Sequence, residues 1–386
     1  MPENEPSLLI RTFLGLMNTE RDAKLPPGAL SRAINVDIDN AGAIERRAGY
    51  TEITGLAGIS ALYATRDESR CYAVADGVMY RIHQASPLSV EAIASGIAPG
   101  AIYWDEIGDK VFFSGAASGE IEYSQVRPLR VQMAPAPLLE ESAGGTLARG
   151  IYRVACVFRD AWGREGGCLS ASIEAQGTIR ITAPMASDYT TVLYASAVDG
   201  DVLFRVADLS GPVFLLEAPH YGATPLSAEQ LAGYHLPAET EQICVYQGRL
   251  YAAIPGDTQT PIYFSHPFWF HLFDALSDVL IVPGTVRMMA ATSAGMVIGT
   301  DRAIWGYVDG IMARLADYGV PEGSSRGYDD ETLYFWTQRG FATAFPFANL
   351  TYDNFINQPA QRVAVGVSKH GTADRLIASL SGVGNG

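Results

Sequence analysis

Apolar and polar residues alternate with a period of two along most of the chain, which is the pattern of half-buried β-strands. Ile34, Val36 and Ile38 alternate with polar residues, a turn follows at 40–42, and a returning strand begins at Ile44. Frequent Gly and Pro residues divide the alternation into short segments. The sequence therefore predicts an all-β protein built from short strands and tight turns.

From about residue 58 the alternation is organised as a repeated unit of three short strands joined by turns. The units cover 59–82, 101–126, 242–266, 286–310, 323–346 and, incompletely, 362–382. A meander repeated in this way is typical of a β-propeller, because each small sheet must bury its faces against its neighbours. We also expect residues 30–50 to pair with, or lie beside, the last strands near 363–380.

The repeat is interrupted between residues 140 and 225, where the strands are longer. Their length and spacing favour an inserted β-sandwich of immunoglobulin or fibronectin type III character. The predicted organisation is an N-terminal element with the first propeller blades (1–139), the sandwich (140–225) and the remaining blades (226–386). Short helical segments are expected at 226–231 and 268–276.

Composition narrows the class of protein. Hydrophobic residues make up 48% and charged residues 18% of the chain, so a large core can form. The formal net charge of −15 argues against a protein that coats DNA, because such proteins neutralise phosphates with Lys and Arg.

The apolar stretch 279–300 contains Pro and Gly, so two buried strands explain it better than a membrane helix. We expect no targeting segment and no membrane insertion.

The cysteines show no C-x-x-C pair, and we expect a reduced protein assembled in a cytosol. They are Cys71, Cys156, Cys168 and Cys244. Cys156 and Cys168 could face each other across a hairpin, and the sequence leaves open whether they pair.

We find no motif for nucleotide binding, metalloprotease chemistry or an activated serine, and we predict no catalytic, cofactor-binding or metal-binding residue. The six histidines are scattered along the chain. Carboxylates that a glycosidase would need, such as Asp105 with Glu106 or the group at 329–331, are expected to be solvated acids in turns.

Aromatic residues supply the candidate interaction site. Phe268, Trp269 and Phe270 are consecutive, and three consecutive side chains cannot all face one side of a strand. Together with Trp162 they are the predicted subunit interface, because exposed aromatic side chains are enriched at such surfaces.

The N-terminal run from Gly15 to Tyr50 contains a Gly-Leu-Met-Asn element, a Pro/Leu-rich stretch, an Asn-Val strand, a Gly turn and Arg-Ala-Gly-Tyr. It resembles the opening of tail nozzle, hub or stopper proteins of short-tailed bacteriophages. The passages ARGIYRVACVFRDAWGREG and VLYASAVDGDVLFRVADL resemble the fibronectin-like insert of those proteins, and ICVYQGRLYAAI with IYFSHPFWFHLFD resembles one of their blades. The order of these passages is more specific than any one of them.

The resemblance implies a virion structural protein and no enzyme or cofactor. Such a protein forms a homo-oligomeric ring, commonly six-fold, below the portal and adaptor of the tail. It docks tail fibres or other tail proteins, and DNA passes through its channel during ejection without specific binding. An acidic channel would suit this passage, because it repels phosphate. The implied location is the virion tail, after assembly in the host cytoplasm.

Two other classes of function remain open from the sequence. A propeller-plus-sandwich adhesin would recognise a surface glycan or protein through exposed aromatic residues. A propeller glycosidase would need carboxylates and an arginine to converge near the propeller axis, and no motif places Arg81, Arg249 or Arg302 there.

Overall fold

The structure is a computed structural model, and it describes residues 12–38, 41–47, 55–85, 88–231, 239–274, 276–322, 326–329, 331–351, 360–370 and 373–381. Within these residues the elements are strands apart from one short 3-10 helix, η1 (Asp22–Lys24), so the all-β prediction is confirmed. The two predicted helical segments are wrong. Residues 228–230 form a turn, and Trp269–Phe273 is a strand. Among the described residues no helix is long and apolar enough to cross a membrane.

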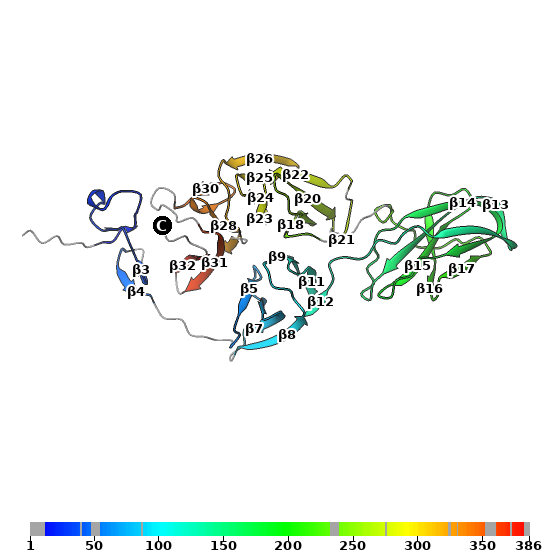
Figure 1. The fold of residues 1–386 in the computed structure, drawn as a ribbon, viewed down its shortest axis with the longest axis horizontal. Coiled ribbons are helices and arrows are strands. Elements are labelled where there is room, and N and C mark those ends of the chain that lie inside the picture. Colours follow the sequence, from blue (N-terminus) through cyan, green and yellow to red (C-terminus); the bar gives the residue numbers. More distant parts are fainter. Residues whose placement is uncertain are drawn as a thin grey trace, which may run out of the picture. The chain divides into compact units, whose positions relative to one another are not determined.

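The chain divides into two compact units. The first comprises Met1–Asp76, Tyr80–Glu91 and Arg287–Gly386, and the second comprises Gly77–Met79 and Ala92–Val286. Both consist of small, separate sheets (Figure 1).

The first unit begins with an element that we call the arm, defined as the described residues of 12–47. In the arm, β1 (Gly15–Leu16) pairs in parallel with β2 (Ala29–Leu30), and β3 (Val36–Ile38) pairs antiparallel with β4 (Ile44–Arg46). The strand and return at 34–46 were predicted from the alternation. The pairing expected between 30–50 and 363–380 is not present among the described strands, because β3 pairs with β4 and the last strands pair with each other.

The meander sheets of the first unit follow one plan, in which consecutive strands are antiparallel neighbours. One sheet, most of it in this unit, contains β5 (Ile59–Ala64), β6 (Cys71–Ala75), β7 (Val78–His83) and β8 (Ser89–Ser95). The next contains β23 (Val286–Thr292), β24 (Gly295–Thr300), β25 (Ile304–Val308) and β26 (Ile311–Ala316). The third contains β27 (Arg326–Asp329), β28 (Thr332–Thr337), β29 (Gly340–Thr343) and β30 (Ala348–Asn349). A final pair contains β31 (Arg362–His370) and β32 (Ala373–Ser381).

The predicted meanders are present, and the three four-stranded sheets above each have a fourth strand, β8, β26 or β30, that lies beyond the predicted unit. Turn chemistry explains the regular spacing. Gln247-Gly248 and Asp309-Gly310 each join paired strands with positive φ at both turn residues, the conformation of a tight two-residue hairpin turn. Asp76-Gly77 has the same pair of positive φ values.

Threonine hydroxyls close the equivalent turns of two successive sheets. The Thr300 hydroxyl donates to the Ala303 carbonyl at 3.0 Å, and the Thr337 hydroxyl donates to the Gly340 carbonyl at 2.9 Å. Each hydroxyl also accepts from the amide two residues later, at 3.2 and 3.0 Å. The two turns therefore share the same pair of threonine hydrogen bonds, which is a further sign of the repeat.

Apolar side chains of these two sheets form one core. The fully buried members include Met288 and Val297 from the first sheet and Leu333 and Phe335 from the second. Each small sheet is therefore stabilised by its neighbour, as the repeat predicted.

The second unit contains two further meander sheets. One is formed by β9 (Ile102–Ile107), β10 (Lys110–Gly115), β11 (Gly119–Glu122) and β12 (Gln125–Arg127). The other is formed by β18 (Gln242–Tyr246), β19 (Arg249–Ala253), β20 (Gln259–His266), β21 (Trp269–Phe273) and β22 (Val279–Pro283). They share a core in which the Phe112 and Phe270 rings lie 4.9 Å apart. The stretch 279–300, predicted to hold buried strands, contains the whole of β22, β23 and β24.

Between these sheets the chain forms a five-stranded sheet, which we call the insert. Its order is β16 (Leu203–Leu209), β15 (Thr190–Ser196), β13 (Leu138–Arg159), β14 (Ser170–Thr182) and β17 (Val213–Leu216). The central strands β13 and β15 bury both faces. Val154 and Cys156 belong to one apolar cluster, and Ala155 and Val157 belong to another. This explains the continuous apolar run in the sequence of β13.

Candidate functional site

The best-defined polar site of the described residues lies where the insert meets the two sheets of its unit. It is built on the hairpin between β13 and β14, in which Arg159 forms a bridge with Glu165. The Asp160 carboxylate accepts the backbone N–H groups of Trp162 and Arg164 at 3.0 and 2.9 Å. An aspartate that bonds to the backbone ahead of it fixes a turn locally. The sequence Asp-Ala-Trp-Gly-Arg thus forms a rigid loop.

Arg164 connects this loop to the neighbouring sheet. Its Nε donates to Asp160 Oδ2 at 2.8 Å, and its Nη2 donates to the Pro128 carbonyl, just after β12, at 2.7 Å. Its Nη1 lies 3.2 Å from Glu120 Oε1 on β11. The guanidinium side chain is only 11% exposed. Arginine suits this role because its planar fork binds several acceptors in fixed directions.

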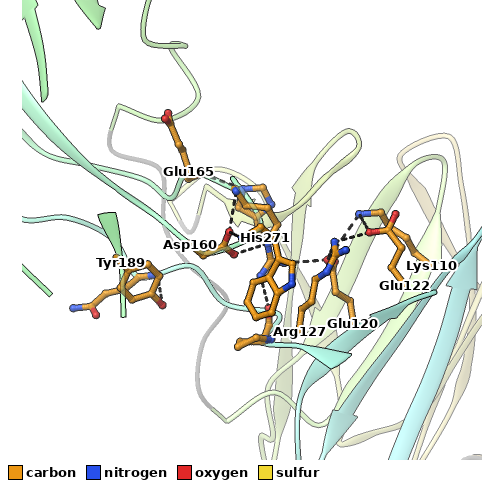
Figure 2. A network of polar contacts seen from close by, with 12 residues as sticks. Lys110, Glu120, Glu122, Arg127, Asp160, Glu165, Tyr189 and His271 are labelled. Atoms are coloured by element: carbon orange, nitrogen blue, oxygen red, sulfur yellow. Dashed lines mark hydrogen bonds and ion pairs between the residues drawn. The ribbon is translucent and has the colours of Figure 1, made fainter. Parts of the chain in front are cut away.

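Glu120 is the centre of a balanced charge cluster. Its side chain is 2% exposed, and three cationic groups lie within 4.0 Å of Oε1: Lys110 at 3.8 Å, Arg127 at 3.6 Å and Arg164 at 3.2 Å. Glu122 pairs with Lys110 and Arg127 as well. We call these residues, together with Asp160 and with His271, the joint; its charged members are three cations and three carboxylates (Figure 2). Such balance is what a buried carboxylate requires, because an unpaired buried charge is costly.

The second sheet reaches the same loop through His271 on β21. His271 Nε2 lies 3.1 Å from the backbone carbonyl of Glu165. Burial and the nearby Arg164 lower the pKa of His271 to about 4, so the ring is neutral at pH 7. Since a carbonyl can only accept, Nε2 carries the proton of this hydrogen bond. The insert loop is therefore held by both neighbouring sheets.

The side chain of Glu165 fixes the loop to the insert and to the returning chain. Its Oε2 accepts from the Tyr194 hydroxyl at 2.9 Å and from the Gln230 amide at 3.2 Å. Burial and this contact with Glu165 raise the pKa of the Tyr194 phenol. The Gln230 carbonyl in turn accepts the backbone N–H of Cys168 at 2.8 Å.

The chain enters and leaves the insert along the same strip. Cys168 forms parallel bridges with Ala134 on the way in and with Leu231 on the way out. A Cβ on Gly166 would lie 2.7 Å from the Gln132 carbonyl, so only glycine permits the incoming segment to pass so closely. Tyr189 also holds that segment, accepting the Gln132 backbone N–H at 3.4 Å (Figure 2).

Chemically, the joint is arranged to hold and orient. Its carboxylates are paired with the guanidinium and ammonium groups around them. Among the described residues no group of three His, Cys, Asp or Glu side chains could hold a metal ion. All four cysteines are free thiols, and burial raises the pKa of Cys156 and of Cys168 to about 12, so neither is a reactive thiolate at neutral pH.

The structure separates the aromatic residues that the sequence singled out. Phe268 is 71% exposed in the turn before β21, and Trp269 is 38% exposed at its start. Phe270 is 6% exposed and packs on Phe112 in the core, so it offers no surface to a partner. Trp162 is 41% exposed in the joint loop, with the guanidinium groups of Arg127 and Arg164 each 5.8 Å from its ring. A subunit contact through Phe268, Trp269 and Trp162 stays a prediction.

The expectation for Asp105 is wrong. It lies in β9, is fully buried, and accepts the backbone N–H of Val245 on β18 at 2.7 Å, so it joins two sheets. Glu331 is exposed, as expected for a turn acid, and the side chains of Asp329 and Asp330 lie outside the described part of the structure. Sequence reasoning also missed Asp160, Arg164 and Glu120. The Asp-x-x-Gly-Arg spacing after an apolar strand was the available signal for the loop, but its partner Glu120 is distant in sequence.

Comparison with known proteins finds no matching family and no curated relative. Among solved structures, the chain is similar to the extracellular domain of a putative hybrid two component system from B. thetaiotaomicron, with 9% identity and a TM-score of 0.30 over 80% of this chain and 35% of that one. It is also similar to apo AztD from Citrobacter koseri, with 12% identity and a TM-score of 0.28 over 75% of this chain and 84% of that one. The chain spans about a third of the length of the first of these proteins. These similarities carry no argument about function.

Proposed function

We propose that the chain is a structural protein of a bacteriophage tail. In this proposal it is a nozzle or hub subunit that forms a six-fold ring below the portal and adaptor, docks fibres and surrounds the path of the ejected DNA. The observation that carries the proposal is the order of the elements. An N-terminal arm, two meander sheets, the five-stranded insert and three further meander sheets follow one another, as the resemblance implies.

The proposed architecture is a β-propeller in which the five meander sheets are blades. Support comes from a contact between sheets that are far apart in sequence but belong to one unit. Arg66, in the turn after β5, donates to the Tyr328 hydroxyl on β27 at 3.2 Å, and its guanidinium carbon lies 4.1 Å from the Tyr328 ring centre. The Tyr328 hydroxyl lies 3.1 Å from the Ala291 carbonyl on β23. A contact between the first and the last meander is what ring closure requires.

We also propose that the insert is a sandwich of immunoglobulin or fibronectin type III character. All five of its strands contribute to one apolar cluster, which includes Val154, Ile179, Leu193, Leu209 and Leu216. The register of β13 against β14 shifts between Ser142 and Leu147 and again before Gly150. Bulges bend a strand, and a bent β13 would let one connected sheet fold over a shared core.

The joint suits a protein that must hold an attached domain in place. A nozzle that carries fibres must keep its accessory domain in a fixed orientation, and the joint ties the insert loop to two sheets with charges that are largely buried. The net charge of −15 suits a channel that must not bind DNA, because phosphate is repelled. The proposal assigns no catalytic residue and no cofactor.

Native mass and particle content test the proposal. The purified full-length protein would be measured by light scattering and negative-stain imaging, and phage particles that contain it would be analysed by mass spectrometry and imaging. We expect rings in solution, or a monomer that becomes a ring in the tail. A stable monomer that is absent from every particle would overturn the proposal.

An adhesin is the second candidate, favoured by the exposed aromatic side chains of Trp162 and Trp269. Aromatic rings at the surface stack on sugars and on protein partners. A glycan array probed with the wild-type protein and with the Trp162→Ala and Trp269→Ala variants separates the two functions. Binding that both variants abolish, by a protein that forms no ring, would favour the adhesin.

A further inference from the structure

We propose that the joint encloses one water molecule, which is bonded to Glu120, Arg127 and Arg164 and covered by the Trp162 ring. The inference concerns a ligand site within one compact unit of the chain. It goes beyond the proposed place of the protein in a phage tail and does not depend on it, so either can fail without the other.

Three polar atoms of the joint are buried and make no hydrogen bond to the described residues. They are Glu120 Oε1, Arg127 Nε and Arg164 Nη1. Glu120 is the most enclosed of the three residues, since its side chain is only 2% exposed. Buried polar groups in proteins are nearly always hydrogen-bonded, because an unsatisfied one is costly. The three atoms therefore need a common partner.

The three atoms belong to side chains that contact one another. Arg164 Nη1 lies 3.2 Å from Glu120 Oε1. Arg127 Nη1, in the same planar group as Nε, lies 3.6 Å from that oxygen, and Figure 2 shows the two side chains next to each other. Neither ion pair has the distance and alignment of a hydrogen bond. Charge attraction thus holds the groups together and leaves their hydrogen bonds to another partner.

The two guanidinium groups cannot turn to satisfy these atoms without losing other bonds. Arg164 donates through Nε to Asp160 and through Nη2 to the Pro128 carbonyl. Arg127 donates through Nη1 to Glu122. Because each planar group is already fixed, a small molecule between them is the arrangement that satisfies both donors and the carboxylate oxygen together.

The atoms that need a partner identify this molecule as water. The two arginine atoms only donate, and the carboxylate oxygen of Glu120 accepts. An anion would be repelled by the carboxylate, and a cation would be repelled by the two guanidinium groups. Water accepts from two donors and donates to the carboxylate. Buried water molecules typically make about three hydrogen bonds of this kind to groups that otherwise lack a partner.

Trp162 supplies the cover. The guanidinium carbons of Arg127 and Arg164 each lie 5.8 Å from the centre of its ring. The residue is 41% exposed, so one part of it faces solvent while another part lies against the two cations. We expect this ring to slow the exchange of the enclosed water molecule with the solvent.

The first test is a crystal structure of the full-length protein at a resolution that shows ordered water. We expect one density peak at about 2.7–3.2 Å from Glu120 Oε1, Arg127 Nε and Arg164 Nη1. A crystal grown in bromide should show no anomalous signal at this peak. A bromide signal there would overturn the proposal, and so would direct hydrogen bonds between these side chains with no peak between them.

The second test counts long-lived water molecules in solution by magnetic relaxation dispersion of the water oxygen. Trp162→Ala should lose one of them, because the enclosed molecule then exchanges quickly. The matched control is Phe268→Ala, which truncates another exposed aromatic side chain of the same unit and should lose none. An unchanged number in Trp162→Ala would contradict the proposal, and so would an equal loss in both variants. If Trp162→Ala does not fold, the wild-type crystal structure decides.

Discussion

The insert and the arm are both additions to the repeated meander sheets, and they are stabilised in opposite ways. The insert buries both faces of its central strands, with Val154, Cys156 and Leu193 on one side and Val157 on the other, all inaccessible to solvent. The arm buries no described apolar side chain and exposes Leu14.

The difference teaches where each region obtains its free energy of folding. Buried apolar area is the main favourable contribution, so the insert has its own stable core, and the joint adds buried charge pairs that hold it to the neighbouring sheets. The arm has hydrogen-bonded geometry, but its described apolar side chains are at most partly buried, and hydrogen bonds alone contribute little net stability. The following changes separate the two cases, in order of decreasing effect.

The largest effect is expected from Arg164→Ala. Removing the guanidinium leaves the buried carboxylates of Glu120 and Asp160 with fewer partners, which should cost about 3–5 kcal/mol of unfolding free energy. Chemical denaturation measures this loss, and limited proteolysis should show faster cleavage near the joint. Arg164→Lys is the control; it keeps the charge but loses the fork, and it should recover part of the stability. A loss below about 1 kcal/mol for Arg164→Ala would contradict a structural role.

Truncating one leucine in each region compares their cores directly. Leu193→Ala removes a fully buried side chain and should reduce the unfolding free energy by about 2–5 kcal/mol. Leu14→Ala removes an exposed side chain and should change the unfolding free energy of the dilute protein by less than about 0.5 kcal/mol. Equal effects in denaturation curves would mean that the arm has a core after all.

The joint should be sensitive to pH through His271. Its pKa is about 4 in the folded protein and about 6.5 when unfolded, so the unfolded chain binds the extra proton first as pH falls. Stability is therefore full above about pH 6.5 and is lost progressively down to about pH 4, by up to about 3 kcal/mol. His271→Gln can still donate to the Glu165 carbonyl but cannot titrate. Denaturation across this range should show a smaller loss for the variant, and an identical loss would remove His271 as the cause.

The smallest effect is expected in the arm. Arg47 Nε lies 3.0 Å from Asp37 Oδ1, and the Arg47 side chain is 46% exposed. Exposed ion pairs of this kind contribute about 0–1 kcal/mol, so Arg47→Ala should barely shift the denaturation midpoint of the dilute protein. A shift above that range would show that the pair organises the arm.

The sequence predicted the parts of the fold that have local causes. The turns at Gln247-Gly248 and Asp76-Gly77 are recognisable because a glycine stands at the second turn position, where the positive φ favours it. The fourth strands were missed for a physical reason. β8 (Ser89–Ser95) and β26 (Ile311–Ala316) are half-buried at most, so no burial pattern marks them.

The candidate site was harder to predict, because it depends on contacts between distant segments. Glu120 lies in β11 and Arg164 lies in a loop of the insert, and no local pattern links them. Asp105 was misread for the same reason, since its burial depends on Val245 in another sheet. The burial of Phe270 was equally hard to predict, because three consecutive aromatic residues do not show which ring packs into the core.

The parallel bridges on either side of Cys168 also bear on how this chain could have arisen. Because Ala134 and Leu231 flank the same residue, the segment between them begins and ends at nearly one place. The segment therefore connects to the surrounding sheets as a long loop does, with its two ends close together. The entropy cost of closing a loop grows only slowly with the length of the loop. A module of this kind can be acquired, exchanged or lost in a single genetic event while the repeated meanders keep their register.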